Sequence, residues 1–397
     1  PGREEALRQI HYPDGWDTLE KAKRRLKFEE VFFLHLLIRE RSILVREGRD
    51  RPAISPPHEL ARDFLKSLPF RLTGAQKRVL GEIRDDVESG RGLSRLVQGD
   101  VGSGKTIVGL ASMLLAVGAG HQAAMMAPTE ILAQQHAMKI EEYLRDLPVR
   151  SALLIGSMNR SEKQAIHNWL AAGEIDLVVG THALIQESIS FRQLGLAVID
   201  EQHRFGVRQR ATLGSGGLLP HFLVMTATPI PRSLAQTVYG DLDLSIIDEL
   251  PFGERDVTTE IVAPERTDEV FESVRAEMRE GRQAFILYPL VEESESLELK
   301  AATAEFEKLS KDEFAGIPIG LLHGRMSFEE KMRAVSMFRS GEILGLVTTT
   351  VIEVGVDIPD ATILLINHPE RFGLAQLHQL RGRIGRAGTG GQCYLLA

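Results

Sequence analysis

The sequence predicts an α/β protein with two tandem parallel-sheet lobes, preceded by a helical segment. Short apolar runs alternate with helical stretches from residue 70 onward, and they form two series separated by the turn-rich residues 251–256. A chain of 397 residues is also too long for one ordinary hydrophobic core. We therefore expect a helical linker over residues 1–69, a first lobe over residues 70–250 and a second lobe over residues 257–397.

The N-terminal segment is expected to contain one long helix. Residues 19–45 show helical periodicity, with a basic start, KAKRRLK, and an apolar body, VFFLHLLI. Three prolines, Pro52, Pro56 and Pro57, then interrupt the chain. Two interpretations of this helix remain open, because it could pack on the lobes or touch a DNA backbone with its basic strip.

Each lobe has six apolar runs that we interpret as buried strands of a parallel sheet. Strands of this kind are covered on both faces, so they read as continuous apolar stretches rather than as an alternation. The runs of the first lobe are residues 96–97, 123–127, 151–155, 177–179, 196–199 and 222–225. Those of the second lobe are residues 259–262, 284–288, 319–322, 344–347, 363–366 and 392–396.

A glycine-rich stretch, GDVGSGKT, lies between an expected strand and a segment with few helix breakers. It fits the phosphate-binding loop pattern of a glycine, four residues and then Gly-Lys-Thr. Glycines let successive backbone N–H groups turn toward an anion, and the lysine then reaches the β- and γ-phosphates at the positive end of a helix. We therefore predict an ATP site formed by Gly99, Gly102, Ser103, Gly104, Lys105 and Thr106, with the hydroxyl of Thr106 on Mg²⁺.

A second acidic element follows one of the expected strands. The apolar run at residues 196–199 leads directly into Asp200 and Glu201. A carboxylate at the carboxyl end of a strand lies at the ligand crevice of an open α/β sheet. We predict that Asp200 holds Mg²⁺, directly or through water, and that Glu201 polarises the attacking water as the general base of ATP hydrolysis.

The second lobe has no such glycine-rich loop in its sequence, but it carries a pair of arginines. Within QLRGRIGR, Arg383 and Arg386 stand three residues apart beside glycines, so both guanidinium groups can project from one face. Arginine suits developing phosphate charge because its planar fork stays protonated and binds bidentately. We predict that this pair reaches across the lobes as an arginine finger.

Composition narrows the class of protein. With 43% hydrophobic and 26% charged residues, the chain reads as globular, and its one cysteine, Cys393, excludes an internal disulfide and a thiolate metal cluster. The nearest approach to a membrane span, residues 106–129, is interrupted by glycines and polar residues at 118–122. We therefore expect no membrane association and a cytoplasmic protein.

The net charge of −8 provides no overall basic excess for a nucleic-acid partner. The acidity lies in the last third of the chain, because residues 251–397 hold 24 Asp and Glu against 16 Lys and Arg. Any contact with DNA is therefore expected to be local.

Four motifs together resemble those of superfamily 2 helicases, namely GDVGSGKT, DEQH, TATPIPR and QLRGRIGR. Further stretches resemble the RecG family of branched-DNA helicases, from about residue 69 to the end. They are MAPTEILAQQH, VVGTHALIQ, VIDEQHRFGVRQR, YGDLDLSIIDELP, LLHGRM, TTVIEVGVDIP and ERFGLAQLHQLRGR. The resemblance implies two RecA-like lobes and an ATP-dependent DNA helicase that acts on stalled replication forks and Holliday junctions in recombination and repair.

Carried over motif by motif, the resemblance implies roles for further residues. The resemblance assigns adenine recognition to Phe70 and Gln76. It assigns nucleotide sensing from the second lobe to Gly355 and Asp357. Coupling of ATP to DNA is assigned to Gln202, His203, Thr226, Thr228 and Gln379. Contacts with the phosphates of one DNA strand are assigned to Thr129, Gly180, Thr181, His182, Arg325 and Thr348, since hydroxyls and loop N–H groups position a strand without reading its bases.

Two alternatives remain open. The transcription-repair coupling translocase shares RFGV and FGLAQLHQLRGR, although it usually has DEEH and GFGKT where this chain has DEQH and GSGKT. The other alternative is a binding module whose ATP state only switches its grip on DNA; hydrolysis coupled to DNA separates it from a motor.

The resemblance also implies parts beyond the motor core. The opening ALRQIHYP resembles the link that joins the RecG wedge domain to the motor, so a wedge is expected before residue 1. A helical hairpin is expected after the GRxGR motif, which makes the second lobe C-terminally truncated. We expect unwinding and preference for a branch to depend on these parts. The expected protein is a monomer that binds branched or forked DNA, with single-strand-binding protein as a candidate partner in the cell.

Overall fold

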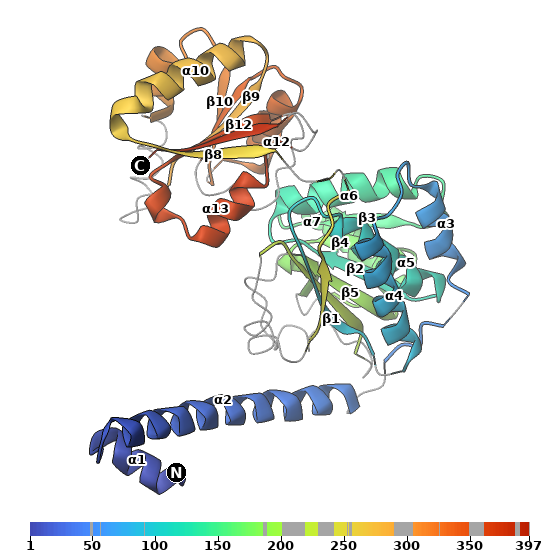
Figure 1. Cartoon of the computed structure of the whole chain (residues 1–397). Coiled ribbons are helices and arrows are strands. Elements are labelled where there is room, and N and C mark those ends of the chain that lie inside the picture. The colour runs from blue at the N-terminus through green and yellow to red at the C-terminus, as the bar shows by residue number, and fades with distance from the viewer. Residues whose placement is uncertain are drawn as a thin grey trace.

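The computed structural model of the chain shows a helical arm followed by two α/β lobes, each built on a parallel sheet (Figure 1). The two-lobe α/β fold predicted from the sequence is thus confirmed. The structure describes residues 1–47, 51–55, 57–90, 92–185, 189–200, 219–228, 242–251, 253, 256–289, 305–324, 326–348, 361–385 and 390–396. We call the sheet of β1 to β7 with its helices lobe 1, and the sheet of β8 to β13 with its helices lobe 2.

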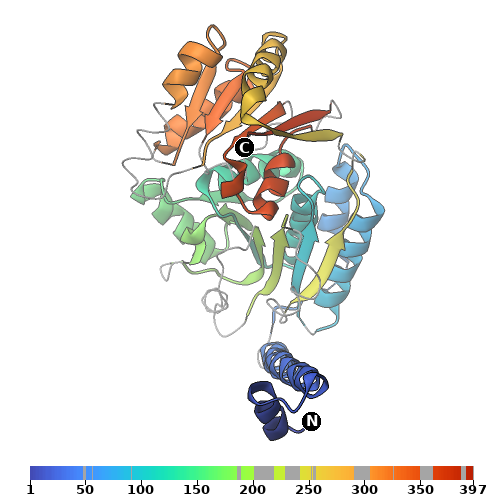
Figure 2. The ribbon, with the colours of Figure 1, turned by 60° about the vertical axis from the view of Figure 1, so that its left-hand side comes forward.

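The arm consists of α1, Arg3–His11, and α2, Trp16–Glu47, which pack on each other. The long helix expected over residues 19–45 is therefore confirmed. Figures 1 and 2 show the arm projecting from lobe 1 rather than lying along it. Apolar side chains of α2, among them Phe28 and Leu37, are exposed. The interpretation that this helix packs on the lobes is not what the structure shows.

In the described part of the chain, lobe 1 has a seven-stranded sheet with the order β3-β4-β2-β5-β6-β1-β7, and every pair of neighbours is parallel. Successive strand residues such as Leu96 and Val97 belong to two separate hydrophobic clusters, so both faces of the sheet are covered. Its strands are β1 Ser94–Gly99, β2 Gln122–Met126, β3 Ser151–Leu154, β4 Leu177–Gly180, β5 Leu194–Asp200, β6 His221–Thr226 and β7 Asp243–Ile247. Its helices are α3 Glu59–Ser67, α4 Gly74–Glu88, α5 Lys105–Gly118, α6 Glu130–Leu144, α7 Arg160–Ala172 and the 3₁₀ turn η1 His182–Ile185.

The core of lobe 1 extends further toward the N-terminus than its sheet. Ile54, Ala61 and Phe64 belong to the same buried cluster as α4 and α5. These residues fall in the segment that the sequence analysis assigns to the linker, which therefore contributes to the packing of lobe 1.

Lobe 2 is a parallel sheet with the order β10-β11-β9-β12-β13-β8. Cys393 lies buried in β13, and burial raises its pKa to about 11. The strands are β8 Val257–Val262, β9 Gln283–Leu287, β10 Ile319–Leu322, β11 Gly345–Thr348, β12 Ala361–Asn367 and β13 Gly391–Leu396. The helical elements are η2 Pro264–Arg266, α10 Thr267–Arg279, η3 Leu309–Glu313, α12 Phe328–Arg339, η5 Pro369–Arg371 and α13 Leu374–Arg381.

Every apolar run expected to be a strand coincides with a strand of the structure, and one strand was missed. β7, with the sequence DLSII, lies at the edge of the lobe 1 sheet and pairs only with β1 among the described strands. Its residues are partly exposed, so it lacks the continuous apolar run that marks the central strands.

The two lobes contact each other where α6 faces α12 (Figures 1 and 2). Ile131 of α6 belongs to a buried cluster made mainly by lobe 2, and Phe328 of α12 packs against the cores of both lobes. A search of the described helices finds none that is both long enough and apolar enough to cross a membrane.

Candidate active site

The glycine-rich loop lies at the carboxyl end of β1 and leads directly into α5. Gly102 and Gly104 have φ angles of +79° and +82°, a left-handed backbone that residues with a Cβ rarely adopt. A Cβ at Gly104 would also lie 2.2 Å from the side-chain nitrogen of Gln76. Backbone geometry therefore favours glycine at both positions, and the close approach of Gln76 adds a spatial reason at Gly104. The hydroxyl of Ser103 is buried and has no hydrogen-bond partner among the described residues.

Lys105 is the first residue of α5, and its ammonium lies at the mouth of the loop. Its Nζ donates to the carbonyl oxygens of Gly99 at 2.8 Å and Asp100 at 2.9 Å. The side chain is almost fully buried. An ammonium at this place adds positive charge to the loop, which attracts a phosphate.

Gln76 connects the start of α4 with the glycine-rich loop. Its Nε2 donates to the carbonyl of Ser103 at 2.8 Å, while its Oε1 accepts from the backbone N–H of Thr73 at 2.9 Å in a capping box. Phe70, three residues before the cap, packs against the lobe 1 core. The structure thus places the two predicted adenine-recognition residues in lobe 1, with Gln76 in direct contact with the loop.

Asp200 ends β5 and is held by a histidine from α6. The Nε2 of His136 lies 2.9 Å from Oδ2 of Asp200, and both side chains are close to fully buried. Burial by itself raises the pKa of the Asp200 carboxyl, but the hydrogen bond from His136 and the positive charges of Lys105 and Arg383 bring the pKa below its usual value. Asp200 is therefore an ionised carboxylate in a buried setting.

Lobe 2 approaches this centre through α13 and the turn that follows it. The charge of Arg383 acts on Asp200, and the Nε2 of Gln379 donates to the hydroxyl of Thr228 at 2.7 Å. Thr228 in turn donates its backbone N–H to the hydroxyl of Thr226 at 3.1 Å. These contacts form one hydrogen-bonded path from the end of β6 to the helix that precedes Arg383.

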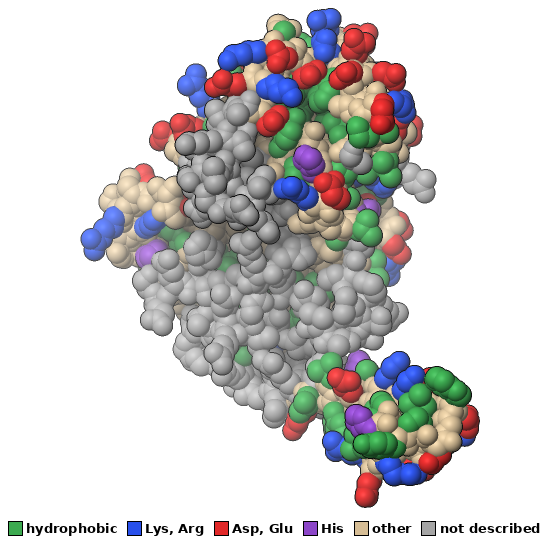
Figure 3. Space-filling view, turned by 90° about the vertical axis from the view of Figure 1, so that its left-hand side faces the viewer, with side chains coloured by type: hydrophobic (Ala, Val, Ile, Leu, Met, Phe, Trp, Pro, Cys, Tyr) green, Lys and Arg blue, Asp and Glu red, His purple; other side chains and the backbone are tan. Residues whose placement is uncertain are grey.

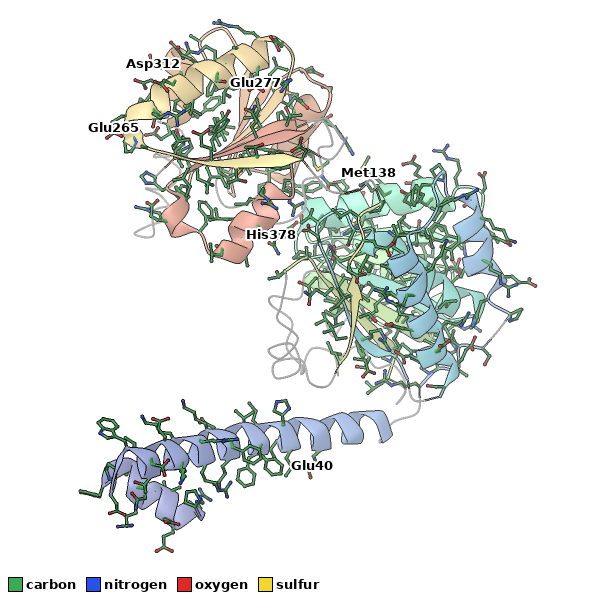
Figure 4. The ribbon with its side chains drawn as sticks, viewed as in Figure 1. Glu40, Met138, Glu265, Glu277, Asp312 and His378 are labelled. Atoms are coloured by element: carbon green, nitrogen blue, oxygen red, sulfur yellow. The ribbon has the colours of Figure 1, made fainter. Side chains whose placement is uncertain are left out.

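A second contact crosses between the lobes beside the phosphate loop. The Nε2 of His378, on the side of α13 that faces lobe 1 in Figure 4, lies 3.4 Å from Oδ1 of Asp100. Asp100 also accepts from the backbone N–H of Val101 at 2.7 Å. The loop that is expected to hold ATP is thus in contact with lobe 2.

The residues predicted to contact a DNA strand lie at the carboxyl ends of strands in both lobes. Thr129 caps α6 and accepts from Leu132 at 3.3 Å. Gly180 ends β4, and a Cβ there would lie 2.3 Å from the carbonyl oxygen of Leu154. The adjoining Thr181 has a buried hydroxyl without a partner among the described residues. Thr348, at the end of β11 in lobe 2, is fully buried, and η1 begins at His182.

Some predicted residues lie outside the described part of the chain, so their roles remain predictions. They are Glu201, Gln202, His203, Arg325, Gly355, Asp357 and Arg386. Among the described residues, no three His, Cys, Asp or Glu side chains come together as a metal cluster. This is compatible with the predicted magnesium ion, which is usually held by one or two carboxylates together with water and substrate phosphates.

His136 belongs to the site although no sequence motif predicted it. Its spacing held a signal, because Ala133, His136 and Ile140 are all buried on the inner side of α6. A histidine on an otherwise apolar helix face needs a polar partner. What the sequence could not show is that the partner would be Asp200, 64 residues away.

Comparison with known proteins agrees with this geometry. Residues 73–237 match the DEAD/DEAH box helicase family, and residues 266–388 match the helicase conserved C-terminal domain. The whole chain is 50% identical to the ATP-dependent DNA helicase RecG of Thermotoga maritima, and 98% of it is 48% identical to RecG of Synechocystis sp.. The chain is similar to RecG helicases over its whole length. It spans about half the length of these relatives, 50% and 47% respectively.

Solved structures support the same conclusion. A structure of RecG bound to a three-way DNA junction matches 99% of the chain with a TM-score of 0.83 and 47% identity, and the chain covers 51% of that protein. Dbp5 of S. cerevisiae, bound to RNA and ADP BeF3, matches 86% of the chain with a TM-score of 0.63 and 17% identity, and the chain covers 87% of it. The second match shows the fold alone. The RecA-like helicase fold and the resemblance to the RecG family are therefore confirmed.

Proposed function

We propose that the chain is an ATP-driven DNA motor that acts on branched or forked duplex DNA in recombination and repair, and that ATP is hydrolysed between its two lobes. One observation carries this proposal: lobe 2 contacts lobe 1 at the predicted site, where Gln379 donates to Thr228 at 2.7 Å and the charges of Lys105 and Arg383 both act on Asp200. A site of this kind is complete only when both lobes contribute. Supporting it, the RecG relatives named above are ATP-dependent DNA helicases.

In this proposal ATP binds at the start of α5. The backbone N–H groups of the glycine-rich loop and the helix N-terminus attract the phosphates, and Lys105 exchanges its carbonyl contacts for phosphate oxygens. Gln76, already bonded to the loop, recognises the adenine edge together with Phe70. The buried hydroxyl of Ser103 is a further donor available to the nucleotide.

The residues present fit a magnesium ion. Mg²⁺ prefers hard oxygen ligands, and Asp200 supplies a carboxylate whose lowered pKa keeps it ionised, while Thr106 supplies a hydroxyl one residue after Lys105. Bound there, the ion would neutralise negative charge on the transferred phosphoryl group. His136 fixes the orientation of the Asp200 carboxylate.

The remaining residues divide the hydrolytic reaction between the lobes. Glu201 orients the attacking water and accepts its proton, and the pair Arg383 and Arg386 stabilises the charge that develops on the transferred phosphoryl group. The hydrogen bonds from Gln379 to Thr228 and within Thr226–Thr228 connect the two lobes, so closure of lobe 2 also acts on the end of β6 in lobe 1. Hydrolysis then depends on lobe closure, and lobe closure depends on a strand held across both lobes.

The proposed DNA contacts are made with phosphates rather than bases. The predicted contact residues Thr129, Thr181 and Thr348 lie at strand ends in both lobes, where Thr129 caps α6 and the side chains of Thr181 and Thr348 are buried. Figure 3 shows acidic and basic side chains interspersed over the near face of lobe 2, a pattern that favours local contacts over a broad electrostatic surface. We further propose that the protein acts as a cytoplasmic monomer, with single-strand-binding protein as a cellular partner.

The test is the steady-state ATPase rate with no DNA, with duplex, with single strand and with a four-way junction, at one fixed salt concentration. The proposal predicts that DNA raises the rate. A rate that DNA leaves unchanged, in a chain that binds both ATP and DNA, would instead support a nucleotide-switched binding module. Stimulation by plain duplex with no measurable strand separation in the full-length protein would favour a translocase of the transcription-repair coupling type.

A further inference from the structure

We infer that α6 transmits contact with a DNA strand to the ATP site, and that His136 is the positioning residue through which it acts on Asp200. This inference rests on the proposed function. It assigns a specific physical connection to a coupling that the motifs leave unspecified.

The connection at one end of the path is a buried charge-assisted hydrogen bond. An ionised carboxylate can only accept, so His136 must donate its Nε2–H to Oδ2 of Asp200 across the 2.9 Å separation. The exposed fractions of the two side chains are 8% and 11%, so water competes little for this bond. The position of His136 on α6 thereby fixes the orientation of the Asp200 carboxylate.

The other end of the path is the first turn of α6, which carries the predicted strand contact and the contact with lobe 2. Thr129 caps the helix through its hydroxyl, and the next residue, Glu130, accepts from the backbone N–H of Ser157 at 3.0 Å. Ile131 is buried in the cluster made mainly by lobe 2. A strand that binds at Thr129, or a lobe that moves against Ile131, therefore acts on the first turn of α6.

The helix between these ends is suited to transmit a displacement. Thr129 and His136 are seven residues apart, about 10 Å along a helix. Every residue of α6 between them lies in continuous backbone hydrogen bonding, and Ala133 and Ile140 hold its inner side against the lobe 1 core. A small shift of the first turn must then move the imidazole of His136, because the helix has no interruption that could absorb it.

The test uses four variants of the chain. His136→Ala removes the donor, and His136→Gln restores an N–H donor without an imidazole. Ile131→Ala cuts the contact with lobe 2 and leaves the hydrogen bond in place. Met138→Ala is the matched control, because Met138 lies on the same helix with an exposed side chain, labelled in Figure 4.

The first readout is metal binding, which needs no turnover. Mn²⁺ replaces Mg²⁺ as the probe, and its free-ion electron paramagnetic resonance signal is titrated against each variant with a non-hydrolysable ATP analogue. His136→Ala should weaken Mn²⁺ binding by about 10–100-fold, the usual effect of losing a partner that orients a metal ligand, and His136→Gln should restore part of it. Ile131→Ala and Met138→Ala should bind Mn²⁺ as the unaltered chain does.

The second readout is stimulation of the ATPase by DNA at saturating Mg²⁺. Both His136→Ala and Ile131→Ala should lose most of the stimulation, whereas Met138→Ala should keep it. Unaltered Mn²⁺ binding in His136→Ala, or full stimulation in a folded His136→Ala variant, would overturn the inference. If His136→Ala fails to fold, His136→Gln decides by the same two readouts. A chain without DNA stimulation would refute the proposed function instead, while the Mn²⁺ titration would still test whether His136 positions Asp200.

Discussion

Lobe 1 and lobe 2 share a sheet order but differ in chemistry at the same place. Matching the two orders puts β8 of lobe 2 where β1 lies in lobe 1. After β1 the chain turns through Gly102 and Gly104 into α5, whose first turn has no acidic residue. After β8 it turns through Pro264 into α10, whose first turn carries Asp268 and Glu269. Proline removes a backbone donor and the carboxylates repel phosphate, so only lobe 1 can hold a nucleotide there.

The same comparison holds for the strand next to the site. β5 and β12 occupy equivalent places and end in Asp200 and Asn367 respectively. Asp200 is a buried carboxylate held by His136, whereas the amide of Asn367 donates to the carbonyl of Leu287 at 3.2 Å. A neutral amide engaged in this way adds no charge for a metal ion. The two lobes therefore share the same sheet scaffold. The loop after the first strand and the residue that ends β5 or β12 decide which lobe binds ATP.

The largest effect should follow from Lys105→Ala. The comparison assigns phosphate binding to lobe 1 alone, so ATP turnover should fall to background, a loss at least as large as the ~10²–10³-fold typical of removing one charge-stabilising donor. The fold should persist because Lys105 is the first residue of α5 and its ammonium donates to carbonyls of the loop rather than packing in the apolar core. ATPase rate and circular dichroism are the measurements. A normal spectrum with a normal rate would show that lobe 1 does not bind the reacting phosphates through this residue.

Glu201→Gln should have the next largest effect. If Glu201 is the general base, the variant should bind ATP normally and hydrolyse it about 10²–10⁴-fold more slowly. Single-turnover hydrolysis alongside ATP binding separates the two steps. A rate within a few-fold of the unaltered chain would place the base elsewhere.

Acid should destabilise lobe 1 through His221, at the start of β6. Its Nδ1 accepts from the N–H of Leu93 at 2.9 Å and its Nε2–H donates to the carbonyl of Pro52 at 2.8 Å, so only the neutral ring fits. Burial lowers the pKa of His221 to about 4, below the value of about 6.5 expected in the unfolded chain.

The direction of this pH dependence follows from which state of the chain binds the proton. Between pH 6.5 and 4 the unfolded chain binds the proton and the folded chain does not, so the stabilisation is complete above about pH 6.5 and decreases by ~3 kcal/mol as the pH falls to about 4. The free energy of unfolding should therefore rise with pH in this window, and His221→Gln should flatten that slope. An identical slope in the variant would mean that other groups cause the acid sensitivity. Lobe 2 has Gly391 at the equivalent strand start and should lack this term.

The smallest effect is expected from Asn367→Asp in lobe 2. The change supplies the missing carboxylate but not the phosphate loop, so the chain should still bind one ATP. Isothermal titration with an ATP analogue measures the number of sites. A second site in this variant would mean that the strand-end residue, rather than the loop, excludes ATP from lobe 2.

Much of the fold and of the predicted ATP site could be predicted from the sequence, because the sequence signals for them are local. Continuous apolar runs marked the central strands, and the glycine spacing marked the loop at Lys105. β7 was not predicted, because an edge strand needs no continuous apolar run. Two hydrogen bonds could not be predicted because they join residues distant in sequence. His136 and Asp200 are 64 positions apart, and Gln379 and Thr228 are 151 positions apart. Only the packing of α6 on the sheet of lobe 1, and of one lobe on the other, brings them together.

A catalytic site completed by lobe 2 is tested most directly by DNA-stimulated ATPase measured together with ATP affinity for Arg386→Ala and Arg383→Ala. Lobe 1 keeps its loop in both variants, so ATP affinity should change by less than about tenfold, while DNA-stimulated turnover should fall by about 10³–10⁵-fold, as when an arginine finger is lost. Arg386→Lys should not rescue turnover, because an ammonium lacks the bidentate fork. Normal DNA-stimulated turnover in both alanine variants would contradict a catalytic site formed between the two lobes.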